Sequence, residues 1–332
     1  MTRAASADPV KATERWFYAH GLPYFVVSEQ REVDEALGRG RLSTVTGVAV
    51  VLSAAAGVGV GLWDSAVSSG VLAAMILFGA VLVGYALVEL RIWPILRWTL
   101  RRTLGSLRLV FPLVTRALPL LMLFITFLFI NADVWQVAAT MKPALLWVVV
   151  LLFSGLAVVF LLVQLPEEVD RVSQDHSDAH LRERVRGSPL AQAVDDTEAA
   201  EVDQRPVRGL QRANLLLVLL VAQVTQVLVL SLAVFAFFIL FGSLTITPTV
   251  IKTWVGHGPH TLGFSWLGSL ELLQVSVFLA AFSGLYFTVY AVTDQLYREQ
   301  FFTNVSDELE RAVSVRAVYL ALRGRRTAQE PG

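Results

Sequence analysis

The longest apolar stretch of the chain is Ala213–Gly242, with the sequence ANLLLVLLVAQVTQVLVLSLAVFAFFILFG. No Asp, Glu, Lys or Arg occurs in it, and none follows before Lys252. As a helix this stretch would be about 45 Å long at 1.5 Å per residue, whereas a bilayer core is roughly 30 Å thick. It is too short for two spans with a turn between them. The stretch therefore predicts one transmembrane helix that tilts or projects beyond the bilayer.

Four other stretches without charged residues are long enough to span a membrane. They lie between Arg41 and Asp64, Asp64 and Glu89, Lys142 and Glu167, and Glu271 and Asp294. A less regular span is expected at about 110–130, where Arg116 lies near the start and can reach the headgroups. Pro112 and Pro119 should bend that span, and neighbouring helices can satisfy the backbone groups that proline frees. The sequence thus predicts an all-α, polytopic transmembrane bundle of about six spans.

The amino-acid composition is typical of a membrane protein and excludes sites that depend on cysteine. Hydrophobic residues make up 55% of the chain and charged residues 16%, against about 25% charged residues in soluble domains. The formal net charge is zero, so bulk charge gives no indication of a nucleic-acid partner. The chain has no Cys, which excludes disulfides, thiolate metal sites and cysteine nucleophiles. Of its 27 Lys and Arg, all but three are Arg, which is typical of a GC-rich bacterial genome.

The distribution of basic residues predicts the orientation. Lys142 and Lys252 lie in connections on one side, and Arg116 lies inside a span. The remaining Lys and Arg fall in four segments on the opposite side: 1–42, 89–109, 166–212 and 293–332. Since cytoplasmic loops carry the excess of Lys and Arg, both termini are expected in the cytoplasm, with the spans in a bacterial cytoplasmic (inner) membrane. The first forty residues lack an apolar core, so no cleavable signal peptide is expected.

The expected organisation has five parts. They are a cytoplasmic N-terminal segment with a short helix (1–42), transmembrane helices one to four with a basic interfacial helix at 91–109 (43–165), a polar cytoplasmic loop (166–209), transmembrane helices five and six (210–293), and a cytoplasmic amphipathic C-terminal helix (294–332). The C-terminal helix is expected to dock under the bundle or to pair with another chain. A protein partner or a homo-oligomer is therefore an open expectation.

The segment 91–109 has the pattern of a basic amphipathic helix. Leucines and Trp93 recur on one face, and four arginines lie on the other: Arg97, Arg101, Arg102 and Arg108. Such a helix between two spans is typical of an interfacial helix that contacts anionic lipid headgroups. The alternative is that these arginines only set the topology. Membrane lipids are the partners that this segment predicts.

Four polar residues of the last two spans are candidates for an intramembrane site: Glu271, Gln274, Gln223 and Gln226. Ionisable residues at membrane depth are commonly functional, and glutamines can also hydrogen-bond between helices as packing contacts. Glu271 lies inside the last span if that span begins near Gly263. It lies among the headgroups if the span begins at Leu272. Both interpretations stay open at this point.

Two further motifs are a row of small residues in the first span and a pair of histidines near the start of the last span. Ser53, Gly57 and Gly61 recur every four residues in the first span, a spacing that lets helices approach closely. His257 and His260 lie close together, but two histidines without a third ligand are a weak indication of a metal, and no metal or cofactor is predicted. Neither Gly-x-Ser-x-Gly nor His-Glu-x-x-His occurs, so no catalytic residue is predicted.

Three stretches carry a resemblance to a known group. They are Phe127–Gln136 (FLFINADVWQ), Tyr290–Phe302 (YAVTDQLYREQFF), and Gly21-Leu22-Pro23. Together they resemble uncharacterised integral membrane proteins of actinobacteria over most of the chain. The resemblance implies a membrane location and no particular activity, and it assigns no site residue.

Three functions compete on the sequence alone. The first is a non-enzymatic binding or scaffold component of the membrane, supported by the lack of catalytic motifs. The second is a transporter or channel that uses the polar residues of the last two spans. The third is a membrane enzyme acting on lipid, which would require clustered His, Asp or Glu at one interface.

Reporter fusions test the predicted topology. A reporter fused after Gly332 should report the cytoplasm, as should one fused before Met1, because the basic segments hold both termini inside. A reporter inserted near Gly256 should report the opposite side. A non-cytoplasmic signal from either terminus would contradict six spans.

Overall fold

The computed structural model describes residues 8–36, 38–89, 92–174, 183–191, 207–261, 268–293 and 295–329. No strand forms within these ranges, where the only β-type pairing is an isolated bridge between Thr261 and Ser269. The helices in chain order are α1 (Pro9–Ala19), the 3-10 turn η1 (Pro23–Phe25), α2 (Val27–Ala36), α3 (Arg39–Trp63), α4 (Val67–Val88), α5 (Ile92–Phe129), α6 (Ala132–Thr140), α7 (Pro143–Gln174), α9 (Gly209–Thr245), α10 (Pro248–Val255), α11 (Leu270–Thr293) and α12 (Gln295–Gln329). The prediction of an all-α bundle is confirmed.

Five described helices are long and apolar enough to cross a membrane: Gly40–Trp63, Val67–Val88, Pro143–Val172, Gly209–Thr245 and Leu270–Tyr290. A sixth candidate consists of Met122–Phe129 and Ala132–Thr140, which meet at a bend of 73°. Asn131 lies at this bend and caps α6, because its side-chain oxygen accepts a hydrogen bond from the Asp133 amide at 2.8 Å. The described residues therefore contain five or six candidate spans, which fits the expected number, but the sixth candidate lies at 122–140 and not at about 110–130.

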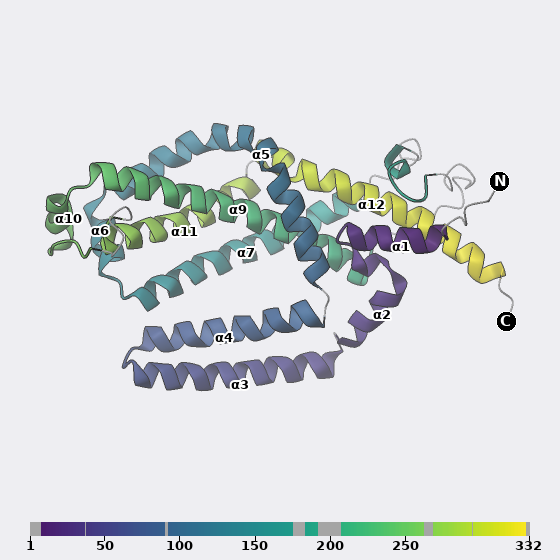
Figure 1. Ribbon diagram of the computed structural model, residues 1–332, viewed down its shortest axis with the longest axis horizontal. Coiled ribbons are helices and arrows are strands. Elements are labelled where there is room, and N and C mark those ends of the chain that lie inside the picture. The colour runs from purple at the N-terminus through teal and green to yellow at the C-terminus, as the bar shows by residue number, and fades with distance from the viewer. Residues whose placement is uncertain are drawn as a thin grey trace, which may run out of the picture.

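Helix α5 combines two segments that the sequence divides. It runs for 38 residues and covers both the basic segment 91–109 and the expected span at 110–130. In Figure 1 it turns sharply along its length, so that its first part crosses the direction of the spans and its second part runs beside α9. Pro112 and Pro119 lie in this helix, and proline is a common cause of a sharp helix bend.

The hairpin of α3 and α4 lies along one side of the bundle formed by α5, α7, α9 and α11 (Figure 1). Gly57 and Gly61 of α3 face Gly70 of α4, and a Cβ added to Gly70 would lie 2.5 Å from the Gly57 carbonyl oxygen. The small residues of the first span thus allow the two helices to approach closely, as their four-residue spacing indicated.

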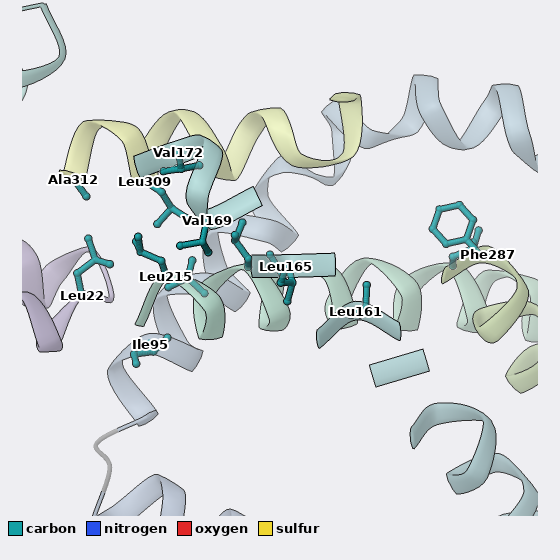
Figure 2. Packing of buried hydrophobic residues seen from close by; sticks show 14 of the residues in the cluster. Leu22, Ile95, Leu161, Leu165, Val169, Val172, Leu215, Phe287, Leu309 and Ala312 are labelled. Carbon is teal, nitrogen blue, oxygen red and sulfur yellow. The ribbon is translucent and has the colours of Figure 1, made fainter. Parts of the chain in front are cut away.

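At the end of the bundle that carries α1 and the end of α12, the buried core joins segments far apart in the sequence. Figure 2 shows Leu22, Ile95, Leu215 and Leu309 gathered around the C-terminal part of α7, where Leu165, Val169 and Val172 are buried. We call this the terminal end. The C-terminal helix docks on the bundle here, since α12 contacts α5, α7, α9 and α11. Its buried residues include Leu309, Val313 and Ala317, which recur every four residues and so lie on one face of the helix.

A buried asparagine attaches the N-terminal segment to the longest span. Asn214 of α9 donates a hydrogen bond from Nδ2 to the Gly21 carbonyl at 3.0 Å and accepts one at Oδ1 from the Tyr24 amide at 3.1 Å. Gly21 has a φ of +70° and packs against Trp98, a conformation that favours glycine. The Gly21-Leu22-Pro23 sequence is therefore the turn that carries the chain from α1 onto α9.

Helices α1 and α12 are also joined by polar contacts. The Tyr319 hydroxyl donates to Glu14 Oε1 at 2.9 Å and accepts from Arg323 at 3.0 Å. Its ring packs edge-on against Phe17, and burial raises the pKa of Tyr319 to about 12. The hydroxyl therefore stays protonated at neutral pH and keeps its role as donor.

Substitution of Gly70 tests the close packing of α3 on α4. Gly70→Ala places a methyl group against the Gly57 carbonyl, so the helices must separate, and we expect a destabilisation of about 1–3 kcal/mol. Gly59→Ala is the matched control, because a Cβ there has nothing within 4 Å and alanine favours helix over glycine. Thermal unfolding in detergent measures both. Equal midpoints would contradict the packing described.

Candidate functional site

The end of the bundle opposite the terminal end carries α6, α10 and the start of α11 (Figure 1), and we call it the loop end. Helix α10 is capped at its start by Thr247, whose hydroxyl accepts from the Val250 amide at 3.4 Å, and at its end by Gly256, which has a φ of +87°. The chain then returns to α11, where the Leu270 amide donates to the His260 carbonyl at 2.9 Å. This reversal brings two histidines to the first turn of α11.

Glu271 is the buried centre of the loop end. It lies in the first turn of α11 with 1% of its surface exposed. The His260 amide donates to both carboxylate oxygens at 3.1 Å, and His260 Nδ1 lies 2.6 Å from Oε1. The carboxylate therefore fastens the preceding loop to the loop-end start of α11.

His257 approaches the same carboxylate. Its Nδ1 lies 3.9 Å from Glu271 Oε1 and 2.9 Å from the Gly258 carbonyl oxygen. The rings of His257 and His260 are 5.1 Å apart, centre to centre. One ligand atom each from His257, His260 and Glu271 lie within 4.8 Å of one another. The sequence showed the two histidines, but their third neighbour is eleven residues away from His260 and is reached only through the reversal of the chain.

Gln274 belongs to the same end of α11 and has a different role. Its Nε2 donates to the Met141 carbonyl at 2.9 Å, so it attaches the connection between α6 and α7. Glu271 and Gln274 thus each hold a separate loop against α11. For Gln274 this contact supports the packing interpretation over a binding role.

Gln223 and Gln226 lie far from Glu271. Gly242 of α9 packs on Leu272 of α11, and Gly284 packs on Ser231, which fixes the register of the two helices. The sixteen positions from Gln226 to Gly242 correspond to roughly 24 Å along α9. The four polar residues that the sequence analysis grouped therefore lie at two separate heights along the bundle and do not form one site.

Both glutamines are buried, and within the described part of the chain their Oε1 atoms have no hydrogen-bond partner. An unpaired amide oxygen in an apolar surrounding costs free energy. The structure gives no physical account of these two oxygens.

The arginines expected to contact lipid divide into different environments. Arg102 pairs with Glu308 of α12 at 3.1 Å, so its partner is the C-terminal helix. Arg97 and Arg101 are exposed on the first part of α5. The side chain of Arg108 lies outside the described residues. Exposed arginines at the terminal end are compatible with a lipid contact for Arg97 and Arg101.

An apolar groove between α7, α9 and α11 was not expected from the sequence. Its volume is about 420 Å³. The lining residues come from all three helices and include Trp147, Phe153, Ala157, Leu161, Val224, Leu228, Ser231, Phe235, Ala281, Gly284 and Thr288. The apolar residues in this lining resemble those of any lipid-facing surface, so the sequence offers no signal for it.

Comparison with known proteins finds no match: no family model matches the chain, and neither a curated protein nor a solved structure does. Function therefore has to be argued from the two features just described, the groove and the loop-end cluster.

Hydrogen exchange tests the two loop attachments. Glu271→Ala removes the acceptor of the His260 amide, so exchange at 256–261 should rise while exchange around the α6–α7 connection stays unchanged. Gln274→Ala should do the reverse, because it releases the Met141 carbonyl. Each variant serves as the control for the other. Unchanged exchange at His260 in Glu271→Ala would contradict the assigned role of the carboxylate.

Proposed function

We propose that this chain is a non-enzymatic integral membrane protein that works by binding, and that its ligand is an acyl chain of a membrane lipid. The observation that carries the proposal is the apolar groove between α7, α9 and α11. Its volume of about 420 Å³ falls within the roughly 300–1,000 Å³ of small-molecule sites, which in helical bundles lie between helices.

The dimensions of the groove suit one extended chain. Along α7 its lining runs from Trp147 to Leu161, which corresponds to roughly 21 Å at the rise of an α-helix. Trp147 lies near the loop-end start of α7, and tryptophan is common at membrane interfaces. An acyl chain could therefore enter beside Trp147 and extend toward the bilayer centre.

The chemistry of the lining favours a hydrocarbon ligand. Among its few hydroxyls, Thr288 already donates to the Gly284 carbonyl at 2.8 Å. Among the described residues that line the groove there is no Asp, Glu, Lys or Arg. A polar or charged ligand would lose hydration without gaining partners, whereas a hydrocarbon chain would replace the lipid tails that the groove otherwise meets.

The competing functions have less support in the described residues. Transport of a polar solute would be favoured by a continuous polar path, but Glu271 and Gln226 lie at different levels and the groove between them is apolar. A membrane enzyme acting on lipid would be better supported if titratable groups lay beside the groove lining. A scaffold that recruits partners through α12 is less supported, because the buried face of that helix already packs on this chain's own bundle.

We place the protein in a bacterial cytoplasmic membrane with its terminal end inside, on the strength of the basic segments. The loop end then faces outward, and the Trp147 end of the groove lies near the outer leaflet. In this orientation, the proposed ligand is a lipid of the outer leaflet.

Filling the groove tests the proposal. Ala281 lines it and is half-buried, so Ala281→Phe should occupy the space of the ligand. Purified protein is incubated with a phospholipid that carries a photoactivatable acyl chain, transferred into detergent, and then irradiated. We expect labelling of α7 and α11 in the wild type and about tenfold less in the variant, equivalent to about 1.4 kcal/mol.

The matched control is Ala236→Phe on α9, whose side chain is exposed and does not line the groove. It should be labelled like the wild type and should show whether an added ring alone disturbs the fold. Equal loss in both variants, or retained labelling in Ala281→Phe with an unchanged melting temperature, would overturn the groove as the binding site.

A further inference from the structure

The loop-end cluster is independent of the groove, and its geometry points to a ligand of a different kind. We propose that His257, His260 and Glu271 bind one divalent transition-metal ion, best matched by Zn²⁺, with a remaining coordination position open to solvent or to a donor atom of another molecule.

The spacing of the three side chains fits one ion. Zinc binds imidazole nitrogen and carboxylate oxygen at about 2.0–2.2 Å, so two ligands of a tetrahedral ion lie roughly 3.4 Å apart. The corresponding distances to Glu271 Oε1 are 2.6 Å for His260 Nδ1 and 3.9 Å for His257 Nδ1. These values lie on either side of the required separation. Binding requires the His257 ring to turn from the Gly258 carbonyl toward Glu271, and the hydrogen bond between His260 and Glu271 to open so that the ion can enter.

The backbone holds two of the ligands together without the ion. Leu270 donates to the His260 carbonyl, and Thr261 pairs with Ser269 across the same connection. The His260 amide in turn contacts the Glu271 carboxylate. The backbone of His260 is therefore held beside Glu271, its ring can open from the carboxylate, and His257, on the glycine-flanked segment between Gly256 and Gly258, can move to complete the set.

A cation explains why these groups converge. Glu271 has a side chain that is 2% exposed, and among the described residues its ion-pair partners are the two histidines. A buried carboxylate needs compensation of its charge. Two imidazole rings 5.1 Å apart, centre to centre, can share one metal ion with the carboxylate.

The exposure of the ligands defines the open position. The side chains of His257 and His260 are 44% and 69% exposed, while the carboxylate lies beneath them. The ion would rest on the loop end with its outer side in water. Two His and one Glu with a vacant position are a known zinc ligand set. The inference assigns a bound ion and no reaction.

Metal titration of the full-length, chelator-treated protein in detergent tests the site. Isothermal titration with Zn²⁺ should give one ion per chain, and His257→Ala should weaken binding by more than about 100-fold, since even the loss of an outer-shell contact costs 10–100-fold. His20→Ala is the control, because His20 lies at the terminal end beside Glu308. His176→Ala/His180→Ala removes the other two histidines of the chain and should leave binding unchanged.

A spectroscopic variant guards against loss by misfolding. The chain has no Cys, so His257→Cys introduces a single thiol at the site. With Co²⁺ as the probe, we expect a thiolate-to-cobalt charge-transfer band that is absent in the wild type and in His257→Cys/Glu271→Gln. Binding that is lost with His176 and His180 but survives His257→Ala overturns the proposal, as does the absence of the band in a folded His257→Cys protein.

Discussion

The close packing of α9 against α11 is the interaction on which the rest of the structure depends. Gly242 lets Leu272 and Phe129 approach α9, and Gly284 brings α11 within contact of Ser231, where an added Cβ would lie 2.5 Å from Oγ. The two helices therefore form one continuous surface. Phe153 of α7 packs on Phe278 and Phe282 of α11, with ring centres 6.0 and 6.1 Å apart. These rings hold α7 beside that surface, and the space left between the three helices is the groove.

The same packing positions the loop end. Because Gly242 is level with Leu272, the first turn of α11 emerges beside the end of α9, where α10 follows after a short connection. Glu271 is thereby placed under the returning loop and is buried against it. At the opposite end, Asn214 of α9 fixes the N-terminal turn, and Arg316 of α12 donates to Gln211 at 2.6 Å. One long helix thus organises both ends of the molecule.

Much of the fold could be predicted because a membrane imposes simple requirements. A helix satisfies its own backbone in lipid, so stretches without charged residues located the long spans directly. The sixth span was harder to place: it was expected at about 110–130, whereas the apolar candidate consists of Met122–Phe129 and Ala132–Thr140, which meet at a bend. The groove could not be foreseen, because Val224 and Leu228 look the same whether they face lipid or a ligand. Contacts between residues far apart in the sequence could not be predicted either. Arg102 forms an ion pair with Glu308, and Glu271 contacts His260 only because the chain reverses between them.

Native mass spectrometry of the protein, extracted gently from its own membranes, tests the central claim most directly. The account predicts a chain that carries one lipid mass adduct in stoichiometric amount, and that keeps it at collision energies which strip the surrounding detergent and loosely bound lipid. A chain that appears without lipid and in fixed stoichiometry with a second protein would contradict the account, because it would assign the function to protein assembly and leave the groove empty.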